Sequence, residues 1–206
     1  MERIELFPTT FFVFKNSSID NVELIQRLQK YTDHVKAGNT ISSLHSLHDK
    51  PEFAELFTWF NACLEQVRLE EKYDCDRFEI TNSWFNIALA RSNMAINYHR
   101  HSMSFFSAVY YLTDGAPTFF EDPVIHRTQA QIEVLRFEYS PHELIFPEPG
   151  KLVIFPSWMY HYAAPHVENF DRYIISFNTL PSGSINYNIA SDSVSNISVN
   201  SREKLK

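Results

Sequence analysis

The chain has 206 residues, enough for one domain with a sizeable core, and its formal net charge of −7 argues against a general nucleic-acid-binding surface, which needs a basic excess. No apolar run approaches the length of a membrane span, and the first ten residues lack the apolar region of a secretion signal, so we expect a cytoplasmic protein with no membrane partner. The two cysteines, Cys63 and Cys75, fit a reducing compartment and match no cysteine-rich metal site.

The first elements in chain order are a strand and a helix. Residues 4–15 are typical of a strand with a proline interruption, and residues 17–31 favour a short helix. Asp20, with Glu23 three residues later, is a plausible capping arrangement for that helix. Its expected apolar stripe consists of Val22, Ile25 and Leu28.

A second helix is better marked. Residues 35–50 are polar and loop-like; Asp49 can then cap the helix, and Pro51 suits its first turn. Apolar residues recur after it at helical spacing: Phe53, Leu56, Phe57, Phe60, Leu64 and Val67.

From about residue 78 the period of the apolar pattern changes from helical to strand-like. Short strands separated by turn signals are expected at 78–90, 93–101, 105–112, 118–121, 132–137, 143–146, 151–155 and 173–178. Two helices followed by about eight strands predict an α+β protein that is mainly β, with a closed or sandwiched antiparallel sheet and helices packed on one side.

This pattern predicts a single domain over residues 1–180. Within it, residues 1–77 form a helical support and residues 78–180 the β core. Residues 181–206 are rich in serine and asparagine, and we expect a polar tail, either mobile or a final edge segment.

Two histidines stand out at residues 99 and 101, immediately before the most apolar strand. Residues i and i+2 of a strand face the same way, so His99 and His101 project together while Arg100 points to the other face. His161 follows a later apolar strand and a Pro-Ser-Trp bend. Three neutral imidazoles meeting in the mouth of a barrel would suit a divalent first-row metal.

Five other histidines are interpreted as non-ligands. They lie in the polar loop before the second helix or stand alone beside prolines and charges: His45, His48, His126, His142 and His166.

The stretch from residue 149 to 178 resembles the C-terminal half of the 2-oxoglutarate- and iron(II)-dependent oxygenases related to prolyl hydroxylases. Members carry His-x-Val-x-Pro and then an arginine that begins a strand; this chain has HYAAP from His161 and RYIIS from Arg172. Five segments together, SWFNI, HRH, SAVYYL, FPSWMYH and RYIISFN, are similar to a narrower family of such oxygenases found in marine bacteria and their phages. The similarity covers residues 83–178.

The resemblance implies a double-stranded β-helix, the jelly-roll and cupin-like architecture, with supporting N-terminal helices. It also implies a dioxygenase that uses Fe(II), 2-oxoglutarate and O₂, converts 2-oxoglutarate to succinate and CO₂, and oxidises a substrate C–H bond, usually by hydroxylation. His99, His101 and His161 would hold the iron. Arg172 would bind the far carboxylate of 2-oxoglutarate through two parallel hydrogen bonds, with Tyr111 and Ser176 beside it.

The chain departs from the superfamily at one ligand. The usual triad is His-x-Asp/Glu…His, and here the acidic position holds His101. Asp122 is the alternative third ligand; it precedes Pro123 and is typical of a strand end or turn. Met103, which would take the acidic position if His101 were the first ligand, is a poor partner for iron(II).

Two other functions remain open from the sequence. One is a cupin-type iron dioxygenase with three histidines that does not use 2-oxoglutarate, and the other is a non-enzymatic jelly-roll module that binds a sugar or peptide. The sequence does not decide whether the substrate is a protein side chain, a free amino acid, a sugar or a small metabolite. It also does not decide whether the protein forms a homodimer.

Overall fold

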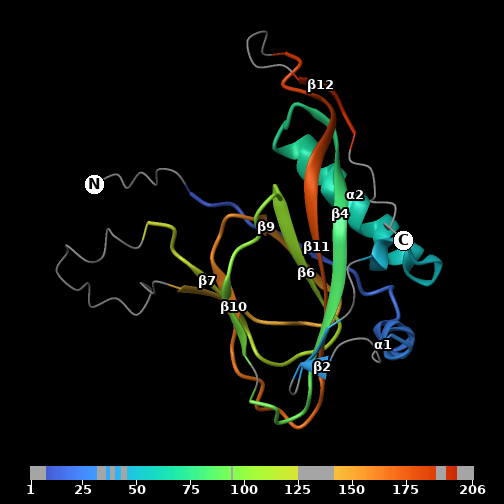
Figure 1. Ribbon diagram of the computed structural model, residues 1–206, viewed down its shortest axis with the longest axis vertical. Coiled ribbons are helices and arrows are strands. Elements are labelled where there is room, and N and C mark those ends of the chain that lie inside the picture. The colour runs from blue at the N-terminus through green and yellow to red at the C-terminus, as the bar shows by residue number, and fades with distance from the viewer. Residues whose placement is uncertain are drawn as a thin grey trace, which may run out of the picture.

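Two antiparallel sheets and two helices make up the fold (Figure 1). The computed structural model describes residues 8–31, 36–37, 40–42, 46–93, 95–124, 142–188 and 194–198. The strand predicted at residues 132–137 lies outside the described residues.

The larger sheet has eight strands. In spatial order they are β1 (Phe12–Lys15), β9 (Lys151–Pro156), β6 (Phe106–Tyr111), β11 (Arg172–Ile185), β4 (Cys75–Ala88), β3 (Thr40–Ser42) and β2 (Lys36–Ala37), while β12 (Val194–Ile197) pairs with β11. The smaller sheet has the order β5 (Ile96–His99), β10 (His161–Ala163), β7 (Thr118–Glu121) and β8 (His142–Ile145).

The helices cover one face of the larger sheet. Helix α1 (Asn21–Gln29) begins where the Asp20 carboxylate accepts hydrogen bonds from two backbone N–H groups of the first turn, as the sequence predicts. Helix α2 (Ala54–Glu70) buries the predicted apolar stripe against β4 and β6. Within the described part of the chain, neither helix has the length and hydropathy that a membrane span requires.

Two details of the helices correct the sequence prediction. Leu28 of the expected stripe is buried and Ile25 packs against the core, but Val22 is 66 % exposed and Leu24 takes its place in the core. Asp49 does not cap α2, because it ends a 3₁₀ turn and Pro51 begins a second one before the helix starts.

The sheet also extends beyond the range predicted for the β core. Strands β1, β2 and β3 come from the segment expected to be a helical support. Strand β11 continues to Ile185 because β4 is equally long and pairs with it as far as Cys75. With β12 paired to the end of β11, part of the segment after residue 180 is an edge of the sheet.

Two apolar layers follow from strand alternation. One lies between the helices and the larger sheet, and the other fills part of the space between the two sheets, where Phe120 of β7 meets Val109, Val153 and Ile174. The two facing sheets form a double-stranded β-helix, and the remaining space between them is a cavity of about 340 Å³.

Candidate metal centre

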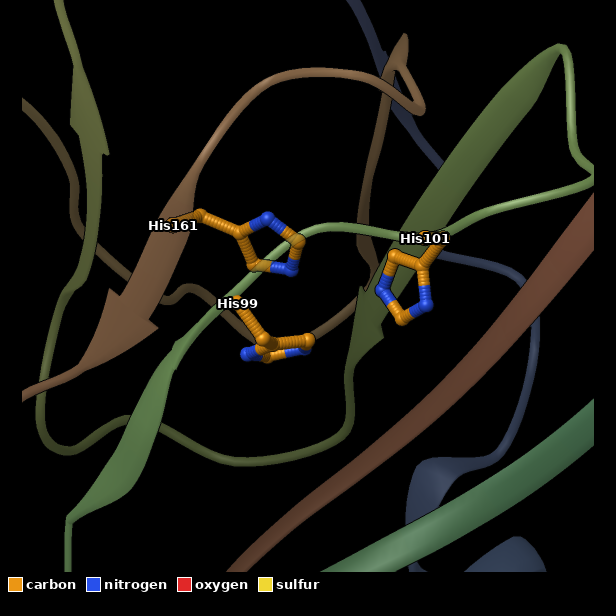
Figure 2. Close-up of side chains that lie close together, drawn as sticks. All are labelled: His99, His101 and His161. Carbon is orange, nitrogen blue, oxygen red and sulfur yellow. The ribbon is translucent and has the colours of Figure 1, made fainter.

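The three predicted histidines meet in the cavity between the sheets (Figure 2). His99 ends β5 and His161 begins β10, and the two are paired in register. His101 lies two residues beyond the end of β5, where its backbone N–H donates to the Ser157 carbonyl at 3.0 Å. One nitrogen from each ring can be chosen so that all three lie within 4.8 Å of one another.

Two of the rings are oriented by backbone carbonyls. His161 Nδ1 lies 3.0 Å from the Met159 carbonyl oxygen, and His99 Nδ1 lies 2.6 Å from the Asn97 carbonyl oxygen. A carbonyl only accepts, so each Nδ1 carries the hydrogen and each Nε2 keeps its lone pair. Such second contacts are typical of metal-binding histidines, because they fix both tautomer and ring orientation.

The cavity keeps the imidazoles of His101 and His161 neutral. Burial, reinforced by the neighbouring His161 and His99, lowers the pKa of His101 to about 3. Burial also lowers the pKa of His161 to about 4, against the opposing effect of its hydrogen bond to Met159. Neutral imidazole is the form that binds a metal, so these two side chains are ready for a ligand role at neutral pH.

Asp122, the alternative third ligand, is not part of this group. Its carboxylate accepts a hydrogen bond from the Val124 backbone N–H at 2.8 Å, which makes it a turn residue after β7. Among the described residues, His99, His101 and His161 form the group of three or more potential donors.

Arg172 lines the same cavity and is almost fully buried, with an exposed fraction of 3 %. Its Nε and one terminal nitrogen have no hydrogen-bond partner among the described residues. Its guanidinium lies 5.9 Å from the centre of the Tyr111 ring, and burial lowers its pKa. A guanidinium stays charged even when buried, so these donors are suited to an anion.

Of the two other residues predicted to bind the co-substrate, one lines the cavity and the other does not. Ser176 lines the cavity on the same face of β11 as Arg172. Tyr111 is fully buried and does not line the cavity; its hydroxyl lies 2.8 Å from the hydroxyl of Thr118, which does. The tyrosine therefore supports the cavity wall through Thr118.

Some residues of the site were not singled out from the sequence. His166 is fully buried; its Nε2 donates to the Phe170 carbonyl at 2.5 Å. A Cβ added at Gly115 would lie 3.0 Å from the His166 ring and 3.3 Å from Arg172 Cδ, so this glycine leaves space that both side chains occupy. No periodicity distinguishes a lone histidine after a proline.

Comparison with known proteins supports this architecture. Residues 82–178 match the family described as putative 2OG-Fe(II) oxygenase. HygX from Streptomyces hygroscopicus, solved with nickel and 2-oxoglutarate bound, is 15 % identical with a TM-score of 0.57 and covers 84 % of this chain and 83 % of its own. A prolyl-4-hydroxylase from Pseudomonas putida is 12 % identical with a TM-score of 0.58 over 85 % of this chain and 94 % of its own.

A third similar structure is SnoK, a non-heme α-ketoglutarate-dependent carbocyclase from nogalamycin biosynthesis. It is 8 % identical with a TM-score of 0.65 and covers 92 % of this chain and 89 % of its own. A search of curated proteins found no match. The segment that matches the putative 2OG-Fe(II) oxygenase family, a family of oxidoreductases, thus contains all three histidines of the cluster and most of the double-stranded β-helix.

Proposed function

We propose that this protein is a dioxygenase that binds Fe(II) through His99, His101 and His161 and 2-oxoglutarate through Arg172, and that it hydroxylates a C–H bond of its substrate. The observation that carries the proposal is a buried guanidinium, with two nitrogens that have no hydrogen-bond partner among the described residues, in the same cavity as three clustered imidazoles. The family match and the bound 2-oxoglutarate in HygX support the choice of co-substrate.

The donor set fits iron(II). Imidazole nitrogen is a good ligand for first-row divalent metals, and three ligands from one side leave positions open for other groups. When bound, iron(II) and 2-oxoglutarate supply the oxidising chemistry, in which 2-oxoglutarate and O₂ yield succinate, CO₂ and an oxidised substrate.

Arg172 fits the distal carboxylate of 2-oxoglutarate. A planar guanidinium donates two parallel hydrogen bonds to a carboxylate, and its unpartnered nitrogens are donors of that kind. Ser176, two strand positions beyond Ile174 on the same face, adds a hydroxyl. Apolar side chains from both sheets keep bulk water from this part of the cavity: Ala108, Val109, Phe155, Ile174 and Ile96.

The arginine also favours this proposal over a cupin-type dioxygenase without 2-oxoglutarate. Such an enzyme has no need for a buried cation beside its three histidines, and a buried cation without a partner is costly. A pure binding module would explain neither the arginine nor the ring orientations.

Anaerobic absorption spectroscopy tests the proposal. Iron(II) and 2-oxoglutarate added without O₂ should give the weak visible charge-transfer band of the chelate. The His161→Ala variant should lose most of its iron, whereas His142→Ala, which removes an imidazole outside the cluster, should bind about one iron per chain like the parent.

The third ligand is tested in the same titration. His101→Ala should lose iron and Asp122→Ala should retain it. Iron binding without the band would favour the cupin-type alternative, and absence of both would favour a binding module. After admission of O₂, succinate should form in proportion to the 2-oxoglutarate consumed.

A further inference from the structure

One wall of the cavity carries side chains that neither the metal nor 2-oxoglutarate requires. On β4, Asn82, Trp84 and Asn86 alternate with buried residues that face the helices, so these three face the cavity. They are paired in register with cavity-lining residues of β11: Asn178 with Asn82, Ser176 with Trp84 and Ile174 with Asn86. We refer to Asn82, Trp84, Asn86 and Asn178 as the amide wall.

Trp84 is placed beside the candidate metal centre. The centroids of its ring and the His101 ring are 5.5 Å apart. Its indole N–H donates to Asn86 Oδ1 at 3.1 Å, which fixes the rotation of the indole. A molecule lying on the indole would therefore be close to the metal.

The amide wall has hydrogen-bonding capacity left over. Asn178 is held by Ser107, whose hydroxyl donates to its Oδ1 at 2.7 Å. Asn82 Oδ1 is buried and has no hydrogen-bond partner among the described residues. A buried acceptor is costly without a donor, so this oxygen is suited to an N–H or O–H group of a ligand.

The charges of the cavity restrict the kind of donor. Among the described residues that line it, Arg172 is the one with a formal charge, and there is no carboxylate. Because imidazole ligands are neutral, iron(II), doubly negative 2-oxoglutarate and Arg172 leave one positive charge in excess. An ammonium group would be repelled there, so the donor that reaches Asn82 should be uncharged.

We propose that the amide wall binds the substrate and that the substrate presents an uncharged, polyhydroxylated ring of the sugar type. Hydroxyl groups donate and accept together, as carboxamides do, and the C–H face of such a ring can pack flat on Trp84. This inference rests on the proposed function, since the excess charge arises only with iron and 2-oxoglutarate bound.

Calorimetric titration of the protein loaded anaerobically with iron(II) and 2-oxoglutarate tests the proposal. The probes are D-glucose, its ammonium counterpart D-glucosamine, its carboxylate counterpart D-glucuronate, and adenosine as a flat aromatic ring. Glucose should bind at least about tenfold more tightly than glucosamine, because the ammonium group of glucosamine is repelled by the excess positive charge.

Matched variants locate the binding. Trp84→Leu and Asn82→Ala should each weaken glucose binding about tenfold or more, whereas Trp158→Leu and Asn61→Ala, at positions outside the cavity, should not. Asn82→Asp should reverse the order of glucose and glucosamine because it adds a carboxylate. Asn86→Asp, which retains the acceptor for Trp84, makes the same test if Asn82→Asp fails to fold.

The charge-transfer band distinguishes a wrong substrate class from a wrong proposed function. If the band forms but no probe binds, or if adenosine or glucuronate binds more tightly than glucose, the substrate class is wrong and the proposed function stands. If the band does not form, the proposed function is wrong and this inference with it.

Discussion

Arg172 carries the choice of co-substrate, because its charge is buried where no described side chain offsets it. Arg172→Ala should weaken 2-oxoglutarate binding by roughly 2–5 kcal/mol, since the carboxylate would enter the cavity without its charge partner. Arg172→Lys should restore only part of the affinity for 2-oxoglutarate, because an ammonium group cannot form the two parallel hydrogen bonds of a guanidinium. Equal 2-oxoglutarate affinity in the parent and the alanine variant, measured by anaerobic titration, would remove this residue from the site.

The two buried imidazoles predict how metal-free protein responds to acid. In the unfolded chain a histidine has a pKa near 6.5, while the folded-state pKa values are about 4 for His161 and about 3 for His101. Between these values the unfolded state binds protons that the folded state does not, so stability falls as pH decreases below about 6.5.

Each such histidine should lower the free energy of unfolding by up to about 1.4 kcal/mol per pH unit in this window, less any contribution screened by solvent. Urea unfolding of the metal-free protein at pH 7, 6 and 5 measures this slope. His161→Asn should flatten it, and a variant with the parent's slope would show that His161 titrates normally in the folded state.

At the scale of elements, the segment that follows β5 determines where His101 lies. Its backbone is tied to Ser157, and the Ser157 hydroxyl is 2.9 Å from that of Ser107 and 2.7 Å from that of Ser104. Both hydrogen bonds link the loop after β9 to the start of β6, so the position of the third imidazole depends on contacts outside its own strand.

Ser157→Ala should therefore affect both stability and the metal. Loss of the hydroxyl removes its hydrogen bonds to Ser104 and Ser107, at a cost of about 0.5–1.5 kcal/mol each in unfolding free energy. Iron affinity should also decrease as the His101 loop loosens. Ser102→Ala, an exposed change in the same loop, is the control. Unchanged denaturant midpoint and iron affinity in Ser157→Ala would show that the hydroxyl network is dispensable.

Elements with a clear apolar pattern were predictable, and elements without one were not. Strand β7 was predicted with its observed bounds. His99 and His101 lie in one cluster as expected, although β5 ends at His99 and the two do not share a strand. Strand β10 was missed because three residues after a bend carry no periodicity, although His161 begins it. His166 was set aside as a lone histidine, and only tertiary packing shows that it is buried.

In the whole molecule, the larger sheet forms one wall of the cavity, but the end of this sheet where β12 pairs with β11 contributes little to the cavity. Strand β12 pairs with the end of β11 through Gly183 and Ile185, and its Val194 and Ile197 remain substantially exposed. Deleting the chain from Ser191 should thus lower the melting temperature by at most a few degrees, because little apolar area is lost. Iron and 2-oxoglutarate binding should be unchanged; a large fall in melting temperature would show that β12 stabilises the sheet.

The sequence predicted the overall architecture, but it did not predict the residues that would bind the substrate. Alternation of apolar residues and five short motifs predicted the β-helix, because the sheets bury one face of each strand. The amide wall is spread over β4 and β11, far apart in sequence, and only their register brings Asn82 opposite Asn178. The composition of a cavity built this way cannot be predicted from one segment.

The metal and co-substrate assignments can be checked in an anaerobic crystal structure with iron(II) and 2-oxoglutarate bound. One iron should lie within about 2.2 Å of a nitrogen of each of His99, His101 and His161. The distal carboxylate of 2-oxoglutarate should contact the Arg172 guanidinium. Iron held by the Asp122 carboxylate with His101 turned away, or a 2-oxoglutarate molecule that does not contact Arg172, would contradict these assignments.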